Sequence, residues 1–268
     1  MFYNAKNGSL EIGNTDMNYI SFGKGRRVLI MIPGVGDGLK TVKGMAKPFS
    51  LMYREFAKEY TVYVFSRKNS LEEGYSTKDM AKDVVFGMKT LGIDKASIIG
   101  VSQGGMIAQH MAIDYPEVIE KLVLVVTLGR QNEIIKSAVE GWIEKAKENN
   151  YKDIMIDFSE RSYSEKSIKK YRRLYPIMTR IGKPKDFTRF IIQATSCITH
   201  DTYDELNKIK AETLIIGGDK DRVVGGHTSK ELADKIPNCE VKIYEGLGHS
   251  AYEEAKDFKD VVLEFLKR

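Results

Sequence analysis

The chain is poor in the residues that build disulfide frameworks and metal sites. Of its 268 residues, 2 are cysteine and 4 are histidine. Cys197 and Cys239 lie far apart in the sequence, which favours reduced thiols over a disulfide framework. Neither a C-x-x-C nor an H-E-x-x-H pattern occurs. We therefore expect no metal site and no cofactor.

The sequence also shows no pattern typical of a membrane-spanning segment or a secretory signal peptide. No apolar run approaches the roughly 20 residues that span a bilayer, and residues 1–10 lack the apolar region of a secretory signal peptide. The net charge of +5 is a small excess that gives no reason to expect a nucleic-acid partner. We expect a cytoplasmic protein without stable membrane insertion.

The small basic excess is unevenly distributed. Residues 166–189 hold nine lysine and arginine side chains against one acidic residue, Asp186. A solvated helix face is the simpler explanation for this segment. The alternative is a surface that attracts anionic substrates or a membrane.

Short apolar segments alternate with helical patterns along most of the chain. Strands are predicted over 18–23, 28–32, 61–65, 96–99, 121–126, 213–216 and 241–244. Helices are predicted between them, over 45–58, 77–91 and 251–266. Continuous apolar strands separated by helices indicate the α/β class, with a mostly parallel central sheet flanked by helices.

One short motif suggests the chemistry. Gly100 to Gly104 spells G-x-S-x-G between a predicted strand and a predicted helix, with Ser102 at its centre. This arrangement is typical of a nucleophile elbow, in which a sharp turn presents a serine hydroxyl. Glycine suits the two flanking positions, because a side chain there would collide with the neighbouring strand and helix.

A nucleophilic serine needs a base and a group that orients the base. His249 follows a predicted strand on a glycine-rich loop, whereas His110, His200 and His227 are better explained as structural, capping or surface residues. Two candidates for the acid, Asp219 and Asp221, follow the strand over 213–216. We favour Asp221, which lies further along the loop, and keep Asp219 as the alternative.

The order Ser102, Asp221, His249, each just after a strand, resembles the α/β-hydrolase superfamily. The resemblance implies that the loop at Gly34–Gly38 supplies an oxyanion-hole amide from Val35, and that Gln103 supplies the other. Pro33 stands where the family usually has histidine. Ser66-Arg67 stands where many relatives carry an aspartate followed by a glycine-rich loop.

The strand–helix alternation stops between residues 127 and 207, where helices are predicted over 132–149, 152–161, 165–175 and 185–195. The resemblance implies a hydrolase core over 1–127 and 208–268 and a helical cap over 128–207. Most aromatic residues of this segment are expected to form the cap's own core. The residues predicted to line the substrate pocket are Gly34, Trp142, Tyr175, Met178 and Phe190.

These features predict a serine hydrolase that cleaves a carboxylic ester of a small, partly hydrophobic substrate through an acyl-enzyme on Ser102. The same triad would serve a thioesterase or a carbon–carbon bond hydrolase, and a ligand receptor that does not turn over is a further alternative. Met106 stands where the related menaquinone-pathway synthase has arginine, which disfavours that reaction. The sequence leaves open whether the protein is a monomer or a homodimer.

Overall fold

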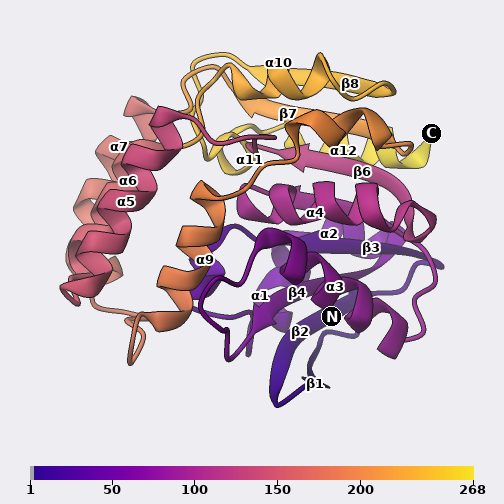
Figure 1. Ribbon diagram of the computed structural model, residues 1–268, viewed down its shortest axis with the longest axis horizontal. Helices are drawn as coiled ribbons and strands as arrows, with labels where there is room; N and C mark the ends of the chain where they lie inside the picture. The colour runs from indigo at the N-terminus through magenta and orange to yellow at the C-terminus, as the bar shows by residue number, and fades with distance from the viewer. Residues whose placement is uncertain (1–2) are drawn as a thin grey trace.

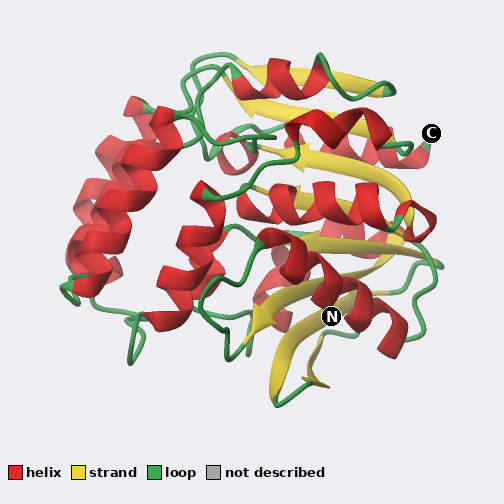
Figure 2. Ribbon diagram, viewed as in Figure 1, coloured by secondary structure: helices red, strands yellow, loops and turns green. Residues whose placement is uncertain are grey.

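A computed structural model describes residues 3–268, which form one sheet with helices on both faces (Figures 1 and 2). The 8 strands lie in the order β1-β2-β4-β3-β5-β6-β7-β8. The pairs β1–β2 and β2–β4 are antiparallel and the other neighbours are parallel. The predicted α/β class with a mostly parallel sheet is confirmed. The strands are β1 Lys6–Ile12, β2 Thr15–Gly23, β3 Arg27–Ile32, β4 Tyr60–Lys68, β5 Ala96–Val101, β6 Ile119–Val125, β7 Glu212–Gly218 and β8 Cys239–Tyr244.

Sequence reasoning missed the strand β1. Its sequence, KNGSLEI, is mostly exposed, with only Leu10 and Ile12 buried. An edge strand of this kind has no continuous apolar run to mark it. Its structure depends on pairing with β2 across a short turn, with Ile12 opposite Thr15.

Each face of the sheet is covered by its own group of helices. One face is covered by α3 Thr77–Thr90, α4 Gln103–Asp114 and α10 Thr228–Ala233, whose apolar side chains form a cluster that includes Met80, Ile107 and Leu232. The other face is covered by α1 Ala46–Met52, α2 Arg54–Glu59, α11 Ala251–Glu254 and α12 Phe258–Lys267, whose cluster includes Phe56 and Phe258.

Two helices predicted as continuous are divided in the structure. The helix predicted over 45–58 is interrupted at Tyr53, between α1 and α2. The helix predicted over 251–266 is interrupted at Ala255, whose backbone is extended (ψ 121°). The apolar spacing that predicted both helices does not distinguish one straight helix from two that bury the same face.

A separate group of helices lies between β6 and β7. Figures 1 and 2 show these helices beyond the carboxyl ends of the parallel strands, toward which the arrowheads point. The helices are α5 Glu133–Lys147, α6 Tyr151–Ser162, α7 Glu165–Tyr171, α8 Tyr175–Met178 and α9 Thr188–Ile198, and all lie within the segment predicted as the cap. Buried apolar side chains of α5, α6 and α9 form a third cluster that also includes Val35 and Met106 of the sheet domain.

Four short 3-10 turns complete the chain: η1 Val35–Gly38, η2 Pro116–Val118, η3 Arg172–Leu174 and η4 Tyr203–Lys208. The first of them, η1, follows β3 and contacts α9. Within residues 3–268, none of the helices has the length and apolar character needed to cross a bilayer.

Candidate active site

The turn between β5 and α4 holds Ser102 in a conformation that side chains rarely adopt. Its φ is 53° and its ψ −117°, outside the regions that non-glycine residues favour. The turn is held on both sides, since Ser102 N–H donates to Val125 O at 2.9 Å and Thr127 Oγ1 donates to Ser102 O at 2.8 Å. Such an outlier, fixed by its surroundings, is typical of a functional site.

The glycines around Ser102 allow the strand and the helix to approach each other. A Cβ at Gly104 would lie 1.9 Å from Ile32 O, and one at Gly100 would lie 2.4 Å from Gly104 O. Neither backbone can accommodate a side chain at these distances. The sequence pattern therefore reflects a steric requirement of this turn.

The side chains of Ser102, His249 and Asp221 lie within hydrogen-bonding distance in a line. His249 Nε2 is 2.9 Å from Ser102 Oγ, and His249 Nδ1 is 2.7 Å from Asp221 Oδ2. They come from the ends of three strands, β5, β7 and β8, which meet at one edge of the sheet. The geometry suits a serine activated by a base whose ring is oriented by a carboxylate.

Asp221 is buried and remains ionised. Burial raises the pKa of this carboxyl group, but His249 and the N–H groups of Val224 and Val223 outweigh that effect and lower it. Both N–H groups donate to Asp221 Oδ1, at 2.8 Å from Val223 and 2.9 Å from Val224. Oδ2 is thus left for the histidine, and the carboxylate is held in one orientation.

Asp219, the alternative acid, has a different role. Its Oδ1 accepts a hydrogen bond from Gly246 N–H at 2.6 Å, and its Oδ2 lies 3.3 Å from Lys220 Nζ. It ties the loop after β7 to the loop that carries His249. Of the two candidates, the structure brings only Asp221 to the histidine.

The backbone N–H groups of Val35 and Gln103 are each the first of a helical turn. Val35 begins η1 and Gln103 begins α4, so neither N–H has a partner within its own helix. The two loops abut, because a Cβ at Gly34 would lie 3.3 Å from Ser102 Cβ. This arrangement suits a pair of donors next to a nucleophile.

The other histidines lie away from Ser102. His200 is buried, with Nδ1 2.9 Å from Thr77 Oγ1 and Nε2 3.3 Å from Thr202 Oγ1. His110 packs edge-on against it, with ring centroids 5.3 Å apart. Burial, together with His110, lowers the pKa of His200 to about 3. His227 precedes α10 and is exposed.

The buried His200 predicts a loss of stability in mild acid. Its pKa is about 3 in the folded chain and about 6.5 in an unfolded one. The unfolded state therefore binds a proton that the folded state excludes, so stability falls as pH drops below about 6.5. We expect the free energy of unfolding in urea to be about 2 kcal/mol lower at pH 5 than at pH 7.

His200→Gln is the matched control for this prediction, since it removes the titrating group. Its loss between pH 7 and pH 5 should be smaller than that of the wild type, with His110 contributing the remainder because burial lowers its pKa too. Equal losses in the two proteins would rule out His200 as the cause.

Two of the predicted pocket residues are buried among α5, α6 and α9, which belong to the segment predicted as the cap. Trp142 is 2% exposed, packs against Phe158 with ring centroids 4.0 Å apart, and donates from Nε1 to Asp157 at 2.6 Å. Phe190 is fully buried and lies so close to Gly38 that a Cβ on this glycine would be 2.7 Å from Phe190 Cα. Both share the apolar cluster of the cap with Val35.

The remaining predicted pocket residues differ in their distance from the nucleophile. Gly34 borders Ser102 directly. Tyr175 is partly exposed and donates its hydroxyl to Glu160 Oε1 at 3.0 Å, and Met178 ends the short helix α8. The structure thus brings Gly34 to the serine and leaves the other four in the cap, where their contact with substrate stays a prediction.

A small apolar cavity that sequence reasoning missed lies against the residues that flank the nucleophile. Its volume is about 240 Å³. It extends from Gly34 and Val101 toward α1 and α11. Its lining includes Pro33, Gly34, Phe49, Tyr53, Val101 and Tyr252.

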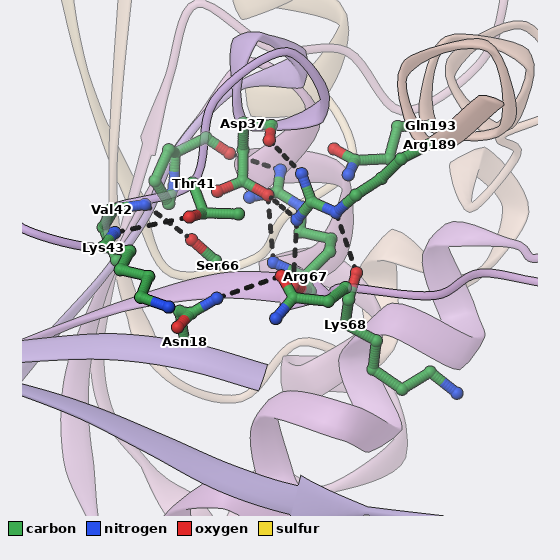
Figure 3. Close-up of polar contacts among 12 residues, drawn as sticks. Asn18, Asp37, Thr41, Val42, Lys43, Ser66, Arg67, Lys68, Arg189 and Gln193 are labelled. Carbon is green, nitrogen blue, oxygen red and sulfur yellow. Dashed lines mark hydrogen bonds and ion pairs between the residues drawn. The ribbon is translucent and has the colours of Figure 1, made fainter. Parts of the chain in front are cut away.

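Sequence reasoning also missed a buried charged cluster beside the oxyanion loop, drawn in Figure 3. Arg189 of α9 forms an ion pair with Asp37 of η1 at 2.5 Å, and the backbone N–H of Arg67 donates to the same carboxylate at 3.0 Å. Arg189 is thus not part of a solvated helix face, as the basic segment suggested. The available signals were the aspartate within the glycine loop and the arginine directly after a buried strand.

Other candidate centres are not evident. No group of three or more His, Cys, Asp or Glu side chains that could hold a metal ion occurs in the described part of the chain. Cys197 and Cys239 are both free.

Comparison with known proteins agrees with this geometry. The model of the family described as "alpha/beta hydrolase fold" matches residues 27–256. The chain belongs to the α/β-hydrolase family. A solved α/β-hydrolase enzyme from a Medee basin deep-sea metagenome library has a TM-score of 0.84 and 24% identity, covering 97% of this chain and 98% of that one.

Curated relatives of this α/β-hydrolase are named for a particular group of substrates. A 2-hydroxy-6-oxononadienedioate/2-hydroxy-6-oxononatrienedioate hydrolase from Burkholderia vietnamiensis is 27% identical over 270 residues, covering 94% of this chain and 91% of the relative. A 2-hydroxymuconate semialdehyde hydrolase from Pseudomonas putida is 27% identical over 197 residues, covering 72% and 69%.

Proposed function

We propose that this α/β-hydrolase cleaves a bond at a carbonyl carbon through an acyl-enzyme on Ser102. The observation that carries the proposal is the line of contacts from Ser102 through His249 to Asp221, at 2.9 and 2.7 Å. A serine in this setting loses its proton to the histidine as it attacks, and the carboxylate stabilises the imidazolium that forms. A receptor could keep the same arrangement, so turnover is the property that distinguishes the two.

The first half-reaction forms one bond and breaks another. Ser102 Oγ attacks the carbonyl carbon, His249 Nε2 takes the hydroxyl proton, and the N–H groups of Val35 and Gln103 bind the oxyanion. Collapse of the tetrahedral intermediate expels the leaving group with its electron pair, and His249 returns the proton to it. Water then attacks the acyl-enzyme, with His249 as base again, and releases a carboxylic acid.

We further propose that the bond is a carbon–carbon bond, the alternative to ester cleavage. The two relatives described above support this, since their named substrates are 2-hydroxy-6-oxo-dienoates rather than esters. In such compounds the 6-oxo carbon is the carbonyl open to attack. The expelled carbanion is conjugated with the oxo group at carbon 2 of the keto tautomer, which stabilises it enough to leave.

Parallel rate measurements on the two substrate classes test the proposal. One arm follows the loss of absorbance of a 2-hydroxy-6-oxohexa-2,4-dienoate, and the other follows release of nitrophenol from p-nitrophenyl acetate and butyrate. We expect kcat/KM to be higher for the dienoate by roughly tenfold or more. In water labelled with ¹⁸O, one labelled oxygen should enter the carboxylic acid product.

The outcomes separate three readings of the site. Faster turnover of the nitrophenyl esters would favour the esterase predicted from the sequence and contradict carbon–carbon cleavage. Tight binding of the dienoate without turnover, in well-folded protein, would favour a receptor. Neither turnover nor a fluorophosphonate adduct on Ser102 would contradict the acyl-enzyme itself.

A further inference from the structure

A buried arginine links the two loops that carry the proposed oxyanion donors. Arg67, near the end of β4, is 1% exposed. Its Nη2 donates to Gln103 Oε1 at 2.7 Å and to Pro33 O, and lies 3.5 Å from Gly34 O. One guanidinium nitrogen therefore contacts both the residue after the nucleophile and the chain leading to Val35.

The Gln103 side chain is fixed at both of its ends. While its Oε1 accepts from Arg67, its Nε2 donates to Gln193 O at 2.6 Å and to Ser196 Oγ at 3.0 Å. Gln193 and Ser196 belong to α9. The residue that begins α4 is thus held between β4 and the cap, so its backbone N–H has little freedom to turn.

The other donor is fixed through its own peptide group. The carbonyl of Gly34 and the N–H of Val35 belong to the same trans peptide, so they point in opposite directions. A cation beside the carbonyl holds the plane of this peptide and polarises it, and the N–H at the far end becomes a better donor to an anion. Arg67 lies on the carbonyl side of this peptide.

The charges of the cluster do not cancel. Figure 3 shows Arg67 and Arg189 converging on Asp37. Burial raises the pKa of Asp37, but Arg189 and Arg67 outweigh it and lower the pKa below its usual range. Burial lowers the pKa of Arg67 to about 10, so it stays charged at neutral pH. The ion pair of Asp37 is with Arg189, so the charge of the Arg67 guanidinium has no acidic partner in this cluster.

Part of the Arg67 guanidinium group has no hydrogen-bond partner. Within the described residues, Arg67 Nε and Nη1 are buried without a hydrogen-bond partner. An incompletely satisfied buried cation costs stability, so its presence calls for a functional explanation. Such an explanation would be that the cation stabilises the negative charge that forms on the substrate oxygen, next to the peptide of Gly34 and Val35.

We propose that Arg67 is a positioning residue of the reaction: it orients the Gln103 and Val35 N–H groups and supplies positive charge beneath them. This inference rests on the proposed function. Arg67 does not reach the substrate itself, because its contacts are to the backbone of the oxyanion loop and to the Gln103 side chain. Its effect should therefore appear when the oxyanion forms and not when the substrate binds.

Three variants and one control test the role of Arg67. Arg67→Met removes the cation, Arg67→Lys restores the charge without the fork of donors, and Gln103→Met removes the side-chain anchor but keeps the backbone donor. The control is Lys68→Met, because the Lys68 ammonium lies over the Tyr75 ring, 4.3 Å from its centroid, and not at the site. All four are compared with the wild type on its best substrate.

We expect Arg67→Met to lower kcat by roughly 10²-fold, the usual effect of losing an oxyanion donor, with KM almost unchanged. Binding of a boronic acid that forms a tetrahedral adduct with Ser102 should weaken in parallel, while binding of the reaction product should not. Arg67→Lys should recover part of kcat, Gln103→Met should lose kcat in the same way, and Lys68→Met should match the wild type.

Equal kcat in the wild type and in folded Arg67→Met would overturn the positioning role. If Arg67→Met does not fold, Arg67→Lys and Gln103→Met decide, and full activity in both would overturn it. A rise in KM with unchanged kcat would contradict it too, since that change reports substrate binding. An inactive wild type without a Ser102 adduct would overturn the proposed function instead, and the positioning role with it.

Discussion

Replacement of Ser102 by alanine is expected to lower kcat by roughly 10⁵- to 10⁶-fold, because no other group near His249 can form the acyl-enzyme. The fold should survive, since the Ser102 side chain does not cap α4 and its Oγ contacts His249. Turnover and intact mass after treatment with a fluorophosphonate measure the effect. The wild type should gain one adduct and the variant none.

Ser97→Ala is the matched control for this change. Ser97 is a buried serine of β5, the strand that leads to Ser102, and its Oγ donates to Glu120 at 3.4 Å, away from the histidine. This variant should keep both the adduct and the turnover. Activity in Ser102→Ala close to that of Ser97→Ala would mean that another residue is the nucleophile.

Asp221→Asn is expected to lower kcat by roughly 10⁴-fold. The asparagine oxygen can still accept from the Val223 and Val224 N–H groups, which leaves its NH₂ group facing His249 Nδ1. That ring nitrogen must then accept a hydrogen bond, so Nε2 carries the proton and can no longer take one from Ser102. The variant should fold normally while losing its rate.

Asp219→Asn distinguishes the two aspartates of the loop. Its amide oxygen can keep the hydrogen bond from Gly246 N–H, so we expect turnover close to that of the wild type. Rates for both variants, measured alongside thermal unfolding, check the assignment. A large loss in Asp219→Asn and a small one in Asp221→Asn would reverse the roles of the two residues.

Hydrogen bonds join the cap to the residues that follow His249. Ser250 N–H donates to Ser162 O at 2.9 Å, and Ser164 N–H and Oγ both donate to Glu254. On the opposite side, Arg189 holds α9 to η1. The end of α6 and the start of α9 are thus fixed to the core, while most of the segment between them, which holds α7, η3 and α8, is more exposed.

Much of the fold was predictable because its signals are local. The strand β5 is mostly apolar, so its burial on both faces follows from its composition. The strand β1 and the interruptions at Tyr53 and Ala255 were missed, because each depends on what packs against the segment. A polar edge strand is stabilised by its partner, and a break in a helix by the surface that the helix follows.

The sequence by itself predicted Ser102 as the nucleophile and His249 as the base, in this order along the chain. The steric demand of the elbow requires glycine at Gly100 and Gly104 whatever surrounds it, and a strand followed by a glycine-rich loop leaves His249 free to reach a site. The sequence narrowed the candidates for the acid to Asp219 and Asp221, but it did not decide between them. The choice depends on which carboxylate the turn directs at the histidine.

Only the tertiary structure decided what surrounds the serine. Asp37, Arg67 and Arg189 come from η1, β4 and α9, and nothing in their local sequence pairs one with another. The burial of Trp142 and Phe190 likewise depends on helices that lie far apart in the sequence. Long-range electrostatic contacts and burial depend on segments distant in sequence, and no local pattern encodes which of them meet.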